Sequence, residues 1–264
     1  MLKFAVETSV LKICRLITLG LATLVYAPGP PAAATLEAGL QHLDTSPGRI
    51  STNFRVRTVG TQPSQRLESE VIKILETWHH RFLVAFETVP EDRIQVMLHS
   101  MSNFHRDTGA PHWADAAYTA QGTIHAAIGG IARVEPDLER RLAHELAHAF
   151  ISRVSAGAAP RWLQEGLAQA LSDRRPAGSL AAEDTAARTP VELGYSGSLA
   201  FARHLLARHG HAALIDALAT MGTGRDVEEA FRVHTGASVS KLFALWRTDI
   251  GKPLARLHDG EDDR

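Results

Sequence analysis

The stretch from Pro136 to Ser152 constrains the fold more than any other part of the chain, because it is predicted to form a helix that must be buried. Pro136 suits a first helical turn, and the acidic Asp137 and Glu139 complement the positive end of the helix dipole. Apolar side chains cover nearly every side of this helix, namely Leu142, Ala143, Leu146, Ala147, Ala149, Phe150 and Ile151. A helix that is apolar all round belongs in a protein interior, so other elements must pack around it.

This buried helix contains the pattern His144-Glu145-Leu146-Ala147-His148. Residues four apart lie above one another on a helix, so both imidazoles can reach one metal ion, while Glu145 is rotated by about 100° and can contact water on that ion. The alternative is a surface helix with two ordinary histidines. Burying imidazoles and a carboxylate without partners would be costly, and metal coordination removes that cost. We therefore predict a metal site here, with Glu145 as general base.

A third ligand is predicted on a second helix, which starts at Pro160 and reaches about Ser172. Glu165 lies in its second turn among apolar neighbours, so a carboxylate on the inner side needs a positive partner. The small residues of the connecting loop allow this helix to turn back beside the first, and Gly166 removes a side chain that would obstruct close helix contact. The expected ligands are thus His144, His148 and Glu165. The alternative for Glu165 is an ordinary surface position.

The first 34 residues have the layout of a secretory signal peptide. Basic residues precede an apolar run from Leu16 to Ala27, and Ala32-Ala33-Ala34 supplies small side chains for cleavage after Ala34. The run is shorter than the roughly 20 residues of a membrane span, although an uncleaved anchor is the alternative. We expect an exported chain, periplasmic or secreted, which stays tethered to the membrane only if the signal is not cleaved.

The charge balance argues against nucleic acid or an anionic membrane as partner, and the cysteine content argues against thiolate ligands to a metal. Lys and Arg number 28 against 29 for Asp and Glu, and this balance gives no field that would attract nucleic acid or an anionic membrane. The sole cysteine, Cys14, lies in the predicted signal, so any metal in the mature chain must use imidazole and carboxylate ligands. No later apolar stretch is long enough to span a bilayer, which argues against an intramembrane protease.

Hydrophobic periodicity predicts an α+β fold, in which a small amino-terminal lobe with a sheet and helices precedes a helical carboxy-terminal lobe. Strands are expected at 54–58, 94–98 and 124–128, and a long helix from Leu67 to Phe86. Later helices are expected at 196–209, 211–221 and 226–246, the last broken near Gly236. Loops that would supply pocket residues are expected at 100–121 and 174–193. The domain would span 51–250, after a linker at 35–50 and before an acidic tail at 251–264.

The two linked motifs, His144-Glu145-Leu146-Ala147-His148 and Pro160-Arg161-Trp162-Leu163-Gln164-Glu165-Gly166-Leu167-Ala168, resemble those of the gluzincin metallopeptidases. More narrowly, the chain is similar to the small peptidase-MA-like domains over about Phe54 to Trp246. The resemblance implies a thermolysin-like fold with one Zn²⁺ ion and hydrolysis of a peptide or protein substrate. It also implies that the strand at 124–128 is the sheet edge along which an extended peptide lies.

The resemblance implies roles for individual residues near the metal. Glu145 would take a proton from the attacking water and deliver it to the leaving amine. Related enzymes use a downstream Tyr or His to stabilise the oxyanion, so Tyr195 is the candidate here and His204 the weaker substitute. The alternative for Tyr195 is a half-buried packing role, and the alternative for His204 is that of a packed core histidine.

The chain departs from several gluzincins at Gln169. There they carry an acidic residue that orients a metal-binding histidine, and in this chain the amide of Gln169 or the carboxylate of Asp173 would take that role. An alternative function from another class is a noncatalytic, zinc-stabilised module of the cell envelope that binds a peptide or partner. The presence of Glu145 favours catalysis, because a structural zinc site prefers four protein ligands and needs no base.

Overall fold

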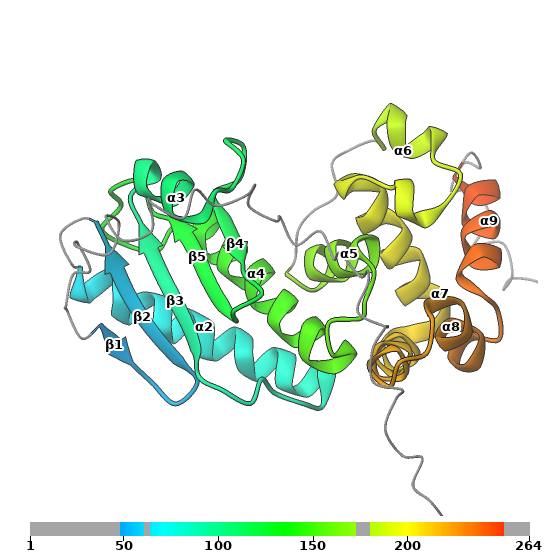
Figure 1. Cartoon of the computed structure of the whole chain (residues 1–264), viewed down its shortest axis with the longest axis horizontal. Helices are drawn as coiled ribbons and strands as arrows, with labels where there is room; N and C mark the ends of the chain where they lie inside the picture. Colours follow the sequence, from blue (N-terminus) through cyan, green and yellow to red (C-terminus); the bar gives the residue numbers. More distant parts are fainter. Residues whose placement is uncertain (1–47, 61–63, 173–179, 251–264) are drawn as a thin grey trace, which may run out of the picture.

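The computed structural model describes residues 48–60, 64–172 and 180–250, and it has the expected α+β class (Figure 1). The predicted signal peptide, most of the predicted linker, Asp173 and the acidic tail lie outside the described residues. The elements in chain order are β1 (Arg49–Ile50), β2 (Phe54–Val59), α2 (Gln65–Phe86), β3 (Ile94–His99), α3 (Met101–Thr108), β4 (Ala116–Tyr118), β5 (Thr123–Ala127), α4 (Pro136–Ser155), α5 (Arg161–Leu171), α6 (Ala182–Ala186), η2 (Pro190–Glu192), α7 (Tyr195–Gly222), α8 (Val227–Thr235) and α9 (Val239–Asp249).

The strands form one five-stranded sheet in the described part of the chain, in the order β1-β2-β3-β5-β4. β2, β3 and β5 are parallel to one another, whereas β1 and β4 are antiparallel edge strands. The expectation that residues 124–128 form the edge is wrong, because β4 pairs with β5 through Ala116 opposite Ala126 and Tyr118 opposite Ile124. β4 escaped prediction because the sequence Ala-Ala-Tyr shows no alternation of apolar and polar residues.

Two predicted loops contain regular structure. α3 lies within 100–121 and is capped by Ser100, whose hydroxyl accepts a hydrogen bond from Asn103 N at 3.4 Å. Only Phe104 of this helix is buried, so the helix carries no apolar stripe that the sequence could reveal. α6 and η2 lie within the other predicted loop, where α6 is a helix of only five residues. The loop predictions are therefore wrong over these segments.

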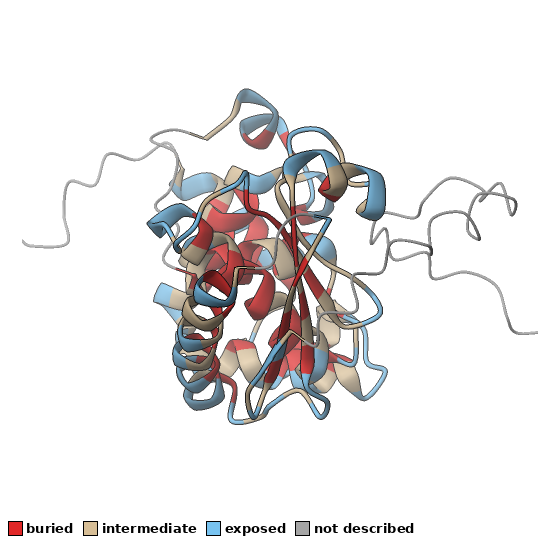
Figure 2. Ribbon diagram, turned by 90° about the vertical axis from the view of Figure 1, so that its left-hand side faces the viewer, coloured by how far each residue is buried: buried red, intermediate tan, exposed pale blue. Residues whose placement is uncertain are grey.

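The amino-terminal core lies between the sheet and helices α2 and α4, as the buried residues in Figure 2 show. The predicted stripe of α2 is buried, and Phe82 and Phe86 lie against Phe150 of α4 with ring centroids 5.5 and 5.6 Å apart. α4 is enclosed as expected and extends three residues beyond Ser152, to Ser155. The helix that carries the histidines is therefore fixed by packing along most of its length.

The helical carboxy-terminal lobe packs around an aromatic cluster. The ring centroids of Trp162 in α5 and Phe201 in α7 lie 5.1 Å apart. The centroid of the Phe201 ring also lies 5.3 Å from that of Phe243 and 5.1 Å from that of Trp246, both in α9. The predicted break within α7 is confirmed at Gly210, where φ is 79° and the helix direction changes. Gly236 ends α8 with the same φ, so the predicted break between the last two helices is also confirmed.

α5 packs closely against α7 at Gly166. A Cβ atom at this position would lie 2.3 Å from the carbonyl oxygen of Ser198 and 2.7 Å from the Cβ of Ala202. Gly166 does permit a close helix contact, as predicted, but the neighbour at this position is α7 and not α4, beside which we expected the helix to pack. The contact fixes α5, and with it Glu165, relative to the start of α7.

Replacing Gly166 by alanine is expected to lower the free energy of unfolding by about 1–3 kcal/mol, because the added methyl group must displace backbone of α7. Helix propensity alone predicts the opposite, a gain of up to about 1 kcal/mol. Equilibrium unfolding in urea measures the difference. Ala170→Gly, at a half-buried position of the same helix, provides the control for propensity. Unchanged or greater stability of Gly166→Ala would show that the helices can separate freely.

Candidate metal centre

The three predicted ligands converge between α4 and α5. The Nε2 atoms of His144 and His148 lie 3.2 Å apart, and Oε2 of Glu165 lies 3.6 Å from the first and 3.8 Å from the second. His144 is 6 % exposed, so water competes little for its ring. The two histidines lie close because they are four residues apart on α4. Glu165, seventeen residues after His148, joins them because α5 returns beside α4.

The ligand atoms fit a tetrahedral zinc site. Bonds of about 2.0–2.2 Å in tetrahedral geometry place ligand atoms about 3.3–3.6 Å apart, which is close to the three separations observed. Oε2 of Glu165 and Nδ1 of His144 are buried and have no hydrogen-bond partner among the described residues. Leaving a carboxylate oxygen in this state is costly, and a cation between Glu165 and the two imidazoles would remove the cost.

Two of the candidate ligands, His148 and Glu165, have the protonation states that metal binding requires. Burial, followed by the neighbouring His144, lowers the pKa of His148 to about 4, so its imidazole is neutral at neutral pH. Burial acts to raise the pKa of Glu165, but the two histidines and Arg161 outweigh it, so the pKa of this carboxyl is lowered. A metal ion would not have to displace protons from these two ligands near neutral pH.

No family model, curated protein or solved structure matches the chain. The site is therefore interpreted from its own geometry. Within residues 48–60, 64–172 and 180–250, the group of His144, His148 and Glu165 is the one cluster of three or more His, Cys, Asp or Glu residues that could hold a metal ion. In the same part of the chain, no helix has the length and apolar character needed to cross a membrane.

Glu145 lies next to His144 on the same helix and is 8 % exposed. Its charge contributes to raising the pKa of Tyr195, which places the two side chains within electrostatic reach of each other. Because α4 is held by packing, Glu145 keeps a fixed position relative to both histidines. A base that acts on water at a metal needs such a fixed position, and that role of Glu145 stays a prediction.

Tyr195 begins α7 and lies beside the metal ligands. Burial, together with the charge of Glu165, raises the pKa of its hydroxyl, against the opposing effect of Arg161. The guanidinium carbon of Arg161 lies 5.6 Å from the centre of the Tyr195 ring. The hydroxyl is therefore protonated at neutral pH and able to donate a hydrogen bond, as the predicted oxyanion role requires. That role itself stays a prediction.

Gln169 links Tyr195 to the helix of Glu165. Its Nε2 donates hydrogen bonds to the carbonyl oxygens of Glu165, at 3.1 Å, and Tyr195, at 2.9 Å. No hydrogen bond from Gln169 to either histidine is present among the described residues, and the buried amide faces α7 through these bonds. Gln169 therefore positions Tyr195 instead of orienting a histidine as we expected. Asp173, the other candidate for that role, lies outside the described residues.

Asp184 fixes the first turn of α7, and sequence reasoning missed it. Its fully buried carboxylate accepts hydrogen bonds from Gly194 N at 2.7 Å, Gly197 N at 2.8 Å and the hydroxyl of Ser196. These bonds satisfy backbone N–H groups that a helix start leaves without partners. The role of Asp184 depends on contacts ten or more residues along the chain, in a segment we expected to be a loop, so no local pattern signalled it.

His204 takes no part in the candidate metal centre. Burial lowers its pKa, and the charged groups near it are Asp249 and Arg208. Among the described residues it makes no contact with the three ligands. His204 is half-buried on α7, about two and a half turns from Tyr195, and this position fits the alternative of a packed histidine.

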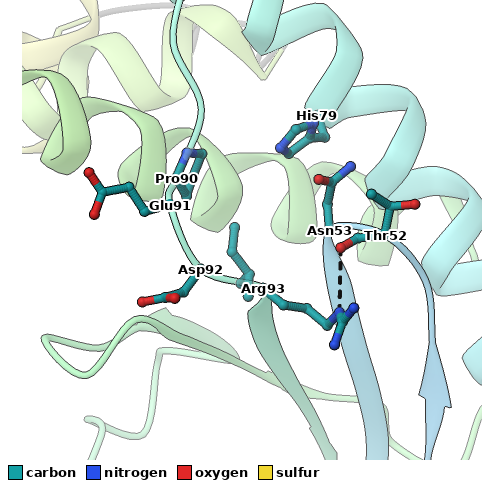
Figure 3. Close-up of a pocket in the computed structure, with 8 residues that line it drawn as sticks. Thr52, Asn53, His79, Pro90, Glu91, Asp92 and Arg93 are labelled. Atoms are coloured by element: carbon teal, nitrogen blue, oxygen red, sulfur yellow. Dashed lines mark hydrogen bonds between the residues drawn. The ribbon is translucent and has the colours of Figure 1, made fainter.

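A small cavity lies apart from the metal centre (Figure 3). It has a volume of about 50 Å³ and is lined by Thr52, Asn53, His79 and residues 90–94, none of which is a predicted site residue. Its polar groups already have protein partners, since Asn53 donates to Glu76 at 2.7 Å and Arg93 donates to the carbonyl of Ser51 at 3.0 Å. This volume holds a few water molecules and is too small for a peptide side chain with its backbone.

Proposed function

We propose that the chain is an exported zinc-dependent metallopeptidase of the gluzincin type with a thermolysin-like fold. The observation that carries the proposal is the convergence of the ligand atoms of His144, His148 and Glu165, with Glu145 next to His144 in the sequence of the buried helix α4. Three protein ligands leave one position of a tetrahedral zinc site for water or substrate, as catalytic zinc sites require. A zinc-stabilised binding module would have no use for that open position.

The side chains around the site have complementary roles in peptide hydrolysis. A Zn²⁺ ion held by the three ligands would polarise the scissile carbonyl and make water more acidic. Glu145 accepts the proton of the attacking water and transfers it to the leaving amine. Tyr195 donates a hydrogen bond to the oxygen on which negative charge develops. Arg161, above the ring of Tyr195, helps to keep that phenol in place.

β4 is the element best placed to bind an extended peptide. It ends the sheet order, so its outer edge carries backbone groups available for strand addition. The residue before it, Asp115, is bound to Arg141 of α4 through its carboxylate at 3.1 Å and its carbonyl at 3.2 Å. Arg141 lies less than one turn before His144 on α4. A peptide on this edge would therefore run alongside the proposed metal.

Metal analysis combined with digestion of an unbiased peptide library tests the proposal. We expect the purified exported chain to contain about one zinc ion per molecule, to cleave peptides, to lose cleavage with a chelator and to regain it when zinc is added. Absence of zinc binding, or cleavage that a chelator does not affect, would contradict the proposal. One bound zinc ion without cleavage of any library member would instead identify a binding module.

A further inference from the structure

Trp113 differs from the other tryptophans of the chain. Trp78, Trp162 and Trp246 are 3–6 % exposed, whereas Trp113 is 70 % exposed. Its ring nevertheless has a defined neighbour, since it makes an edge-to-face contact with the ring of Tyr195, with the centroids 5.8 Å apart and the planes at 75°. A large aromatic ring left mostly in water has area available for a ligand.

Trp113 is connected to the proposed metal centre through two elements, the segment before β4 and the start of α7. It lies three residues before β4, in a segment that the bonds between Asp115 and Arg141 hold against α4. Its neighbour Tyr195 starts α7, on the opposite lobe, and lies within electrostatic reach of Glu165 and Glu145. The Trp113 ring therefore lies where the start of the edge strand meets the oxyanion candidate.

We infer that Trp113 is a specificity residue that contacts a large apolar side chain of the peptide, close to the bond that is cleaved. This inference rests on the proposed peptidase function and adds the class of side chain that is preferred. An indole in edge-to-face contact with another ring offers a rigid apolar surface at a low cost in conformational entropy. Arg161, beside the same tyrosine, disfavours a lysine or arginine side chain at this place.

A purely structural role for Trp113 accounts less well for its exposure. A residue that joined the lobes by packing would bury most of its surface, as Trp162 does at 3 % exposure. The contact with Tyr195 is edge-to-face, with the two planes at 75°, so the two rings do not stack on each other. The exposed 70 % of Trp113 is consequently the surface that a substrate side chain would cover.

Fluorescence quenching provides a test that does not depend on turnover. The zinc-loaded Glu145→Gln variant would be mixed with a blocked peptide Ser-Ala-Gly-Phe-Ala-Gly-Ser or with the same peptide carrying alanine in place of phenylalanine. Because the other three tryptophans are buried, acrylamide quenching of tryptophan emission reports mainly on Trp113. We expect the phenylalanine peptide to reduce quenching and the alanine peptide to have a much smaller effect. The effect should disappear in the double variant that also carries Trp113→Phe.

Equal protection by the two peptides, or protection by neither, would contradict the inference. Cleavage kinetics provide the second measurement. The ratio of kcat/KM for the phenylalanine peptide over the alanine peptide is expected to fall about tenfold in Trp113→Ala and to be largely kept in Trp113→Phe. An equal loss for both peptides would assign Trp113 a structural role. The wild-type chain could fail to cleave any peptide while the phenylalanine peptide still protects Trp113 from quenching. That result would contradict the proposed activity and support the contact with Trp113.

Discussion

Replacing Glu145 by glutamine is expected to reduce the rate of peptide cleavage by about 10²–10⁴-fold while zinc stays bound. Glutamine has nearly the same volume as glutamate, so the packing of α4 is kept, but an amide cannot accept the proton of the attacking water. Glu145 does not belong to the cluster of proposed ligands, so the metal content should not change. Cleavage kinetics and metal analysis of the same preparation measure the two effects separately.

Glu139→Gln is the matched control for this substitution. Glu139 lies on the same helix, and its carboxylate accepts a hydrogen bond from Trp78 Nε1 at 3.1 Å, which the glutamine carbonyl can still accept. This variant is expected to cleave peptides at the wild-type rate. Cleavage that persists at the wild-type rate in Glu145→Gln would remove Glu145 from the proposed mechanism, and loss of zinc in that variant would make it a ligand.

The same substitution at Glu165 is expected to cause loss of zinc, in contrast to Glu145→Gln, which should keep it. Glu165→Gln replaces the anionic ligand by a neutral amide and should weaken zinc binding by more than about a hundredfold, because changes outside the ligand set already cost about 10–100-fold. Zinc at a hundred times its dissociation constant stabilises the wild-type protein by about 2.7 kcal/mol. The variant should lose most of this zinc-dependent stabilisation, which thermal unfolding with and without added zinc measures.

Without zinc, the stability of Glu165→Gln should fall only modestly. The substitution removes the favourable interaction of the half-buried carboxylate with the two histidines and Arg161, but it also removes the cost of an Oε2 atom that has no hydrogen-bond partner among the described residues. Glu145→Gln, which keeps the metal, is the control for replacing a buried carboxylate near the site. Equal zinc affinity in wild-type and Glu165→Gln protein would exclude Glu165 as a ligand and remove the main support for the peptidase proposal.

The elements predicted correctly are those whose signal is local and long. α2 shows an apolar stripe over several turns, and α4 combines a proline start with an apolar surface. α3 and β4 could not be predicted, because the first buries a single side chain and the second has three residues. The place of β4 at the sheet edge depends on pairing between strands, which the alternation within one strand does not encode.

In the candidate metal centre, too, the features that depend on the local sequence were predictable, and those that depend on contacts between separate elements were not. The proximity of the two histidines was predictable because residues four apart on a helix share a face, and the approach of Glu165 because a carboxylate among apolar neighbours needs a partner. The bonds of Gln169 to Tyr195 and the anchoring of α7 by Asp184 depend on contacts between separate elements. Sequence reasoning consequently assigned Gln169 the wrong neighbour and did not detect Asp184.

α4 belongs to both cores of the molecule, since it packs against α2 and the sheet on one side and against α5 and α7 on the other. The two imidazoles come from this shared helix, whereas the carboxylate reaches them only once α5 has docked. A chain exported in an unfolded state would thus lack a competent binding pocket during transit. Under the proposed function, metal capture would follow the docking of α5, and a chain in which α5 has not docked would be unable to cleave peptides.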